Sequence, residues 1–142
     1  PLPKYRGGSP IQNQIINGEK ESAVTLFLMD SGVDTGDIIA QESMSLDGHL
    51  NDVFERIYQL GCKLTFDILE NGYTTIKQDD SRSTYYRRRK KSDSEITLDE
   101  IKEKSGDYLY NKIRMLEDPY PNAFIRTKDG KKLLIKWAEL GE

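Results

Sequence analysis

The most regular pattern in this chain is the spacing of its apolar residues between positions 49 and 71. They recur at intervals of three and four, which predicts an amphipathic helix of about six turns. Asp47 stands near its start, and Asn71-Gly72 is a typical stop signal. The periodic residues are Leu50, Val53, Phe54, Ile57, Leu60, Leu64 and Ile68.

Two predicted strands precede this helix. The run AVTLFLM (23–29) is continuous, apolar and rich in β-branched residues, as expected of a strand covered on both faces. The run IIAQESMSL (38–46) alternates between apolar and polar residues and predicts a second strand. Strands next to a long amphipathic helix indicate an α/β fold.

Further elements are predicted after residue 100. The stretch 107–116 has the pattern of a second amphipathic helix, which Pro119 and Pro121 end. The tail, from residue 123 on, predicts two strands joined by a two-residue turn at Asp129-Gly130. We therefore expect a body over residues 1–117 and a short β-hairpin tail over residues 118–142.

Composition excludes several classes of protein. With 142 residues, 36% apolar and 32% charged, the chain is long and apolar enough for one globular domain. The net charge of −3 argues against general nucleic-acid binding, and no apolar run is long enough for a membrane span. Cys62 is the only cysteine and cannot form an internal disulfide, which favours a cytoplasmic protein.

The stretch MDSGVDTGDII (29–39) crowds three aspartates directly after the first predicted strand. In α/β proteins, ligands bind at this edge of the sheet, and glycines let the backbone approach them. One aspartate could then handle protons. The alternative is an ordinary polar connection with aspartates in turn positions. A Ca²⁺ loop is a third reading, but the aspartate spacing does not match the EF-hand pattern, and we expect no metal.

The first residues, PLPKYRGGSP, lead into a helix that is predicted to start at Pro10 after the N-cap residue Ser9. Arg6 and the free N–H groups of a helix start can form an anion site. A capped helix with a surface arginine explains the same residues equally simply.

Taken together, these two stretches resemble the catalytic core of the folate-dependent formyltransferases. That superfamily includes methionyl-tRNA formyltransferase, glycinamide ribonucleotide transformylase and the nucleotide-sugar N-formyltransferases. Its motif runs through Leu-Pro, an Arg-Gly turn, a short helix ending in Asn-Gly-Glu, a strand, and a Met-Asp-x-Gly-x-Asp-Thr-Gly loop. The matching residues are Leu2-Pro3, Arg6-Gly7, Asn17-Gly18-Glu19, Val24-Thr25 and the loop from Met29 to Gly36. The resemblance implies the C-terminal part of a Rossmann-like formyltransferase domain, incomplete here, with a small β appendage.

The resemblance also implies roles for individual residues. Asp34, before Thr35-Gly36, would be the catalytic aspartate, and Tyr5 and Arg6 would lie on the acceptor side. The reaction would move a formyl group from N10 of 10-formyltetrahydrofolate to a neutral amine, with the aspartate helping to move the proton through water. The pterin pocket would be lined by the backbone of Met29, Asp30, Ser31, Gly32 and Val33.

The family's catalytic Asn and His lie just upstream of the Leu-Pro turn, and these 142 residues do not contain that pair. The only histidine, His49, is predicted to stand at the start of the long helix and not in the active site. The chain begins without Met inside a Pro-rich turn, so we expect a fragment that is inactive alone. A sheet without the upstream strands would expose an edge and apolar surface, which favours self-association, for example as a homo-oligomer, or partial disorder.

Two classes of acceptor fit the sequence. The segment YYRRRKKSDSEI (85–96) is similar to formyltransferases of surface-polysaccharide pathways, which favours an amino sugar on a nucleotide diphosphate. Methionyl-tRNA is the alternative, because RRRKK (87–91) after two tyrosines could contact RNA. Flanking acidic residues largely balance that charge and favour a solvated loop. A non-catalytic module that binds anions or proteins is the alternative from another class.

Overall fold

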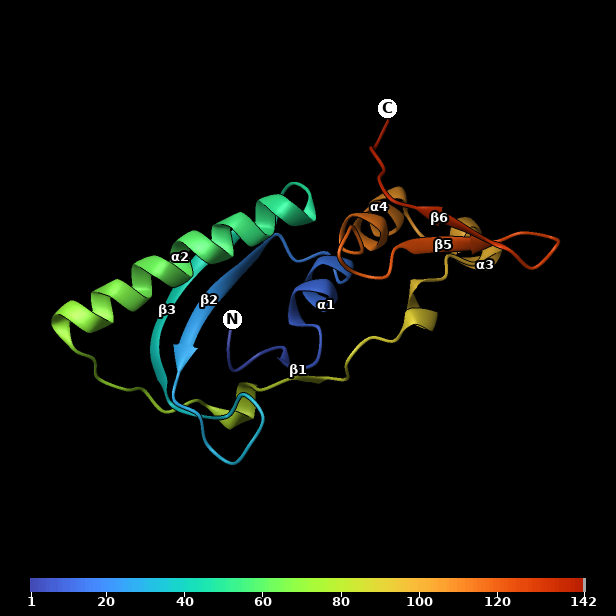
Figure 1. The fold of residues 1–142 in the computed structure, drawn as a ribbon. Coiled ribbons are helices and arrows are strands. Elements are labelled where there is room, and N and C mark those ends of the chain that lie inside the picture. Colours follow the sequence, from blue (N-terminus) through green and yellow to red (C-terminus); the bar gives the residue numbers. More distant parts are fainter. Residues whose placement is uncertain (142) are drawn as a thin grey trace. The chain divides into compact units, whose positions relative to one another are not determined.

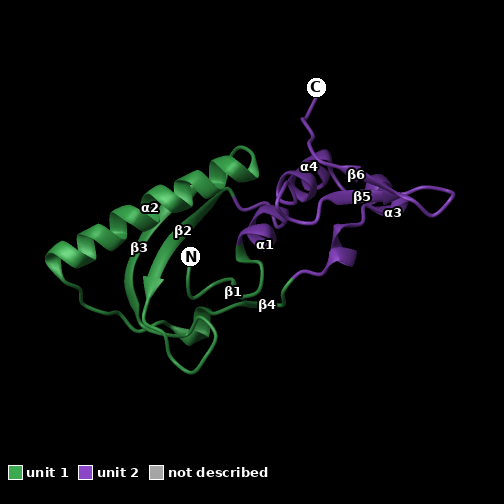
Figure 2. Cartoon of the chain, in the orientation of Figure 1, with its two compact units in different colours: residues 1–10, 20–88 green, residues 11–19, 89–142 purple. Residues whose placement is uncertain are grey.

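A computed structural model describes residues 1–141, which form two compact units (Figures 1 and 2). The first unit comprises residues 1–10 and 20–88, and the second comprises residues 11–19 with the described residues from 89 onward. The expected boundary between residues 117 and 118 lies inside the second unit. The division into a body and a hairpin tail stays a prediction. None of the helices in the described part of the chain is long and apolar enough to cross a membrane.

Helices and strands are interspersed along the chain, as in an α/β fold. In chain order they are β1 (Arg6–Gly7), α1 (Pro10–Ile16), β2 (Glu21–Phe27), β3 (Ile38–Ser45), α2 (Leu50–Asn71), the 3₁₀ turn η1 (Asp80–Arg82), β4 (Tyr85–Tyr86), the 3₁₀ turn η2 (Lys91–Ser94), α3 (Leu98–Glu103), α4 (Gly106–Arg114), β5 (Ala123–Arg126) and β6 (Lys132–Ile135).

The first unit is built on an antiparallel pair of strands and one long helix. β2 pairs with β3 so that Glu21 lies opposite Ser45, and α2 runs along this pair (Figure 1). A register shift at Leu26/Phe27 bends the end of β2, where the aspartate loop begins. The core residues of this unit come from β3, α2 and the turn between them: Met44, Leu46, Leu50, Val53 and Leu64.

The prediction that the strand 23–29 is covered on both faces is wrong. The strand ends at Phe27, and the side chains from Ala23 to Phe27 are only half-buried. Met29, placed in the strand by its apolar character, is 94% exposed. The physical reason is that, within residues 1–141, β3 is the only strand that pairs with β2, so the other edge of β2 has no neighbouring strand.

The predicted long helix is confirmed as α2. It begins after His49, whose N–H donates to the Asp52 carboxylate over 2.8 Å. An acidic residue in the first turn of a helix commonly accepts such a bond from the N-cap N–H. It ends where Gly72 adopts a φ of 72° and donates to the Ile68 carbonyl. His49 therefore stands at a helix start, as predicted.

The second unit contains α3, α4 and the β5–β6 hairpin. Its core is made by Met115, Leu116, Ala123, Phe124 and Ile96. The ammonium of Lys112 on α4 lies inside it, 2.7 Å from Glu100 Oε1 on α3 and 2.6 Å from the Glu95 carbonyl oxygen. One buried cation thus joins two helices and the segment that pairs with β5.

The predicted tail hairpin is confirmed, but its turn is longer than predicted. Gly130, at a φ of 79°, donates to the Thr127 carbonyl, and Thr127 pairs with Lys131. This leaves three turn residues, 128–130, the arrangement in which glycine occupies the left-handed position after a type I turn. Asp129-Gly130 predicted the place of the turn correctly and its length wrongly.

Candidate active site

Asp34 lies in the loop between β2 and β3, and the first residues of the chain hold its carboxylate. Its Oδ2 accepts a hydrogen bond of 2.8 Å from the backbone N–H of Gly7 in β1. Its φ of 56° is in the left-handed region, which residues other than glycine seldom adopt. The side chain is half-buried, so the carboxylate is both oriented and accessible.

Gly36 brings the two ends of the loop together. A Cβ at this position would lie 1.7 Å from the Leu28 carbonyl oxygen, which no side chain could accommodate without moving the backbone. Next to it, the Leu28 N–H donates to the Asp37 carbonyl over 2.9 Å and extends the strand pairing. The glycine is therefore required for the close approach that places Asp34.

Replacing Gly36 by Ala is expected to lower the free energy of unfolding by about 2 kcal/mol, because the added methyl group pushes Leu28 away from Asp37. Urea unfolding followed by far-UV circular dichroism measures this. Gly61→Ala is the matched control, since nothing lies within 4 Å of a Cβ at that helical position. That change should leave stability equal or higher. Equal stabilities of wild type and Gly36→Ala would contradict the assigned contact.

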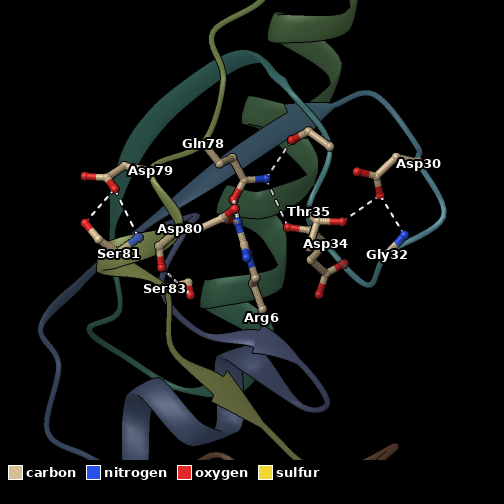
Figure 3. Close-up of polar contacts among 11 residues, drawn as sticks. Arg6, Asp30, Gly32, Asp34, Thr35, Gln78, Asp79, Asp80, Ser81 and Ser83 are labelled. Atoms are coloured by element: carbon tan, nitrogen blue, oxygen red, sulfur yellow. Dashed lines mark hydrogen bonds and ion pairs between the residues drawn. The ribbon is translucent and has the colours of Figure 1, made fainter.

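Asp30 has a different role in the same loop. Its Oδ1 accepts from the Thr35 hydroxyl over 2.6 Å and from the Gly32 N–H over 2.9 Å, which folds the loop tip (Figure 3). These bonds, that from Thr35 above all, hold the pKa of the exposed Asp30 carboxyl below its ordinary value. Asp30 therefore stays ionised and shapes the loop, while Asp34 is held by another segment. In residues 1–141, no three His, Cys, Asp or Glu side chains gather as metal ligands would.

β1 supplies the other wall of the site. It pairs in parallel with β4, so that Arg6 lies opposite Tyr85 and Gly7 opposite Tyr86. The buried Tyr5 ring stacks on the Tyr86 ring, with centroids 4.9 Å apart and planes 6° from parallel. A Cβ on Gly7 would lie 2.5 Å from the Tyr86 carbonyl oxygen, so the close pairing of the two strands depends on this glycine.

The guanidinium of Arg6 points inward and has internal partners. Its Nη2 donates to Gln78 Oε1 and to Asp80 Oδ1, both over 2.8 Å, and only 7% of the side chain is exposed (Figure 3). Gln78 also donates to the carbonyl oxygens of Asp34 and Gly36. Arg6 thus supports the loop from within, and its predicted place on the acceptor side stays a prediction.

The structure brings the segment that contains Tyr5 and Arg6 next to Asp34: Gly7 donates to the Asp34 carboxylate, and Gln78 links Arg6 to the Asp34 carbonyl oxygen. The five residues predicted to line a pterin pocket form the exposed tip of the loop, with Met29 94% and Val33 53% exposed. Within residues 1–141, no hydrogen bond engages the backbone of Met29, Ser31 or Val33. These peptide groups are therefore available to a planar ligand with donors and acceptors along its edge, and their role in a pterin pocket stays a prediction.

Gln78 is the site residue that the sequence did not indicate. It lies in a polar segment without periodicity, and its partner Arg6 is 72 positions away in the chain. Thr84 is similar, since its hydroxyl accepts from the Tyr5 N–H over 2.8 Å. Nothing in the local sequence announces such contacts, because they exist only once β1 and β4 are paired.

Residues 2–64, which include β1, the aspartate loop and most of α2, match the family model described as Formyl transferase. A methionyl-tRNA formyltransferase of Lachnospira eligens is 42% identical over 147 aligned residues, which cover 99% of this chain and 45% of that protein. The chain thus spans less than half the length of this curated relative.

Solved structures agree with the sequence match. A methionyl-tRNA formyltransferase from Clostridium thermocellum superposes with a TM-score of 0.80 at 31% identity, covering 94% of this chain and 63% of that one. An N-formyltransferase from Helicobacter canadensis, solved with folinic acid and dTDP-3-aminofucose, has a TM-score of 0.62 at 30% identity, covering 80% and 44%. The fold is therefore α/β and corresponds to part of a formyltransferase domain, and the chain belongs to the formyltransferase superfamily.

Proposed function

We propose that the protein containing this chain transfers a formyl group from 10-formyltetrahydrofolate to a primary amine, with Asp34 as the proton-handling carboxylate. The single observation that carries this is the bond from the Gly7 N–H to Asp34 Oδ2, 2.8 Å long, in a segment that matches the formyltransferase family. A carboxylate that is fixed by another element, half-buried and next to an exposed loop is suited to a reacting group.

The loop tip is the proposed folate-binding element. The unengaged peptide groups of Met29, Ser31 and Val33 can pair with the donor and acceptor edge of a pterin, and Asp30 keeps the tip folded. When bound, the folate would supply an activated formyl group. The residues of this chain would hold the ring, orient Asp34, and let its carboxylate take up the proton that the amine loses, directly or through water. As the amine bonds to the formyl carbon, the bond from that carbon to N10 would break, and the proton would pass to the leaving N10.

For the acceptor we propose an amino sugar carried on a nucleotide diphosphate. The basic run 87–91 supports this choice over RNA, since part of its charge is engaged locally. The Arg89 guanidinium is held by Nη2, which donates to the Asp93 carbonyl oxygen over 2.8 Å. The backbone N–H of Lys90 donates to the Asp93 carboxylate over 2.7 Å, which keeps that negative charge beside the run. Methionyl-tRNA is the second candidate, favoured by the 42% identity to the Lachnospira relative. A cytoplasmic location is part of this proposal.

The deciding experiment uses the full-length protein that contains these residues. It measures formyl transfer from 10-formyltetrahydrofolate to nucleotide-diphosphate amino sugars and, separately, to methionyl-tRNA. We expect turnover with an amino sugar, and with methionyl-tRNA neither turnover nor salt-dependent binding, which an RNA site would show as a steep loss of affinity between low and physiological salt. If the protein turns over methionyl-tRNA and no amino sugar, methionyl-tRNA is the acceptor and the amino-sugar proposal is wrong. Absence of folate binding would overturn the proposed function itself and favour a non-catalytic module.

A further inference from the structure

The carboxamide of Gln78 is buried, and both of its polar atoms are fully used. Nε2 donates to the Asp34 carbonyl oxygen over 3.0 Å and to the Gly36 carbonyl oxygen over 2.6 Å. Oε1 accepts from Arg6 Nη2 over 2.8 Å and from Nε over 3.3 Å. The amide has one sensible orientation, because a flipped amide would set N–H groups against the guanidinium and an oxygen against two carbonyls. Figure 3 shows Gln78 between Arg6 and the loop.

These contacts hold Asp34 at both ends. The Gly7 N–H binds its carboxylate, and Gln78 binds its carbonyl oxygen, while Arg6, the residue before Gly7, holds Gln78. Asp34 needs such support because its left-handed backbone is unfavourable for a residue with a side chain. Asp80 in turn fixes the guanidinium. Asp80, Arg6 and Gln78 therefore form a chain of hydrogen bonds that ends at the Asp34 carbonyl oxygen.

We propose that Gln78 is a positioning residue for the reaction: its amide fixes the backbone of residues 34–36 so that the Asp34 carboxylate meets the reacting amine. This rests on the proposed function, in which Asp34 handles the proton. The hydrogen bonds of Gln78 go neither to the proposed folate-binding residues nor to the carboxylate itself, so it should govern the rate of the chemical step more than donor binding.

The test is Gln78→Glu in the full-length protein. A glutamate keeps the shape and the bond to Arg6, but it replaces the donor atom by an oxygen facing two carbonyls. We expect kcat to fall about 100-fold, as for a reacting group displaced by roughly 1 Å, with the KM for the folate within about threefold. Gln59→Glu is the matched control: Gln59 is exposed on α2 and donates only to Glu55, so kcat should not change.

A double-variant cycle separates positioning from general destabilisation. In an Asp34→Asn background, Gln78→Glu should lower kcat less than about threefold further, because the group it positions is already lost. A full 100-fold loss in that background would overturn the proposal, as would an unchanged kcat in Gln78→Glu. If Asp34→Asn alone leaves kcat intact, the role of Asp34 fails, whatever Gln78 does.

Gln78→Met provides a second variant without a new charge. It removes both hydrogen-bonding functions at nearly constant volume and should show the same fall in kcat and the same loss of effect in the Asp34→Asn background. If neither Gln78 variant yields folded protein by circular dichroism, Gln78 serves the fold and the positioning proposal is overturned.

Discussion

Asp34→Asn in the full-length protein should lower kcat by about 10²- to 10⁴-fold, the range that a positioned acid or base contributes. An asparagine has the same shape, and its amide oxygen can still accept from the Gly7 N–H. Folding should therefore survive, and the loss should come from the missing proton acceptor. Steady-state kinetics with saturating folate and acceptor measure it, with circular dichroism to check the fold.

Asp67→Asn is the matched control for that experiment. Asp67 is exposed on α2, away from the loop in the chain, and the same change of chemistry there should leave kcat within about twofold. A wild-type rate in Asp34→Asn would move the working carboxylate to another residue. A loss of folded protein would instead assign Asp34 to the architecture of the loop.

Lys112→Met should produce the largest loss of stability, about 3 kcal/mol, because it leaves Glu100 and the Glu95 carbonyl without their buried donor. Lys112 is 5% exposed, and Glu100 is 20% exposed. Partial burial raises the pKa of Glu100, but the hydrogen bonds from Lys112 and its neighbours outweigh this and lower it overall. The ion pair is therefore favourable to the folded state. Urea unfolding followed by the fluorescence of Trp137, in the same unit, reports the change.

Lys63→Met tests the importance of burial. Lys63 also binds a glutamate, Glu42, at 2.7 Å, but its side chain is 56% exposed. An exposed pair of this kind contributes at most about 1 kcal/mol, so this variant should unfold close to the wild type. Equal losses from Lys63→Met and Lys112→Met would show that the environment of Lys112 does not strengthen its contacts.

Regular elements were predictable where one physical signal dominated. In α2, apolar residues at helical spacing and a following Asn71-Gly72 predicted both type and extent, because the helix packs one face and exposes the other. The place of the β5–β6 turn followed from Asp129-Gly130, since glycine tolerates the left-handed backbone there.

The helix α3 depends on a capping signal and not on apolar spacing. α3 begins at a capping box, in which Thr97 Oγ1 accepts from the Glu100 N–H over 3.1 Å and the Glu100 carboxylate accepts from the Thr97 N–H. That four-residue pattern stands in the sequence, but its helix is only six residues long and has little periodicity. The pattern of caps was thus more informative here than the pattern of apolar residues.

The site was predictable only in part. The crowding of aspartates after β2 indicated the loop, and the resemblance indicated Asp34. Local sequence alone could not show which role each of the three aspartates has. The structure assigns Asp30 to shaping the tip and uses the Asp37 carbonyl to extend the strand pairing. The contacts of Gln78 join residues more than 40 positions apart, and such long-range pairing has no local signature.

The donor that holds Asp34 is a peptide group, and this has a consequence for divergence within the superfamily. A side-chain donor can be lost by one substitution, whereas the Gly7 N–H belongs to the backbone and stays in place when the side chains around it change. Side chains that face the acceptor in the proposed function could thus change while the carboxylate keeps its place. Inheritance of the chain path, more than of particular neighbours, would let one ancestral scaffold serve amines as unlike as a sugar and a charged tRNA.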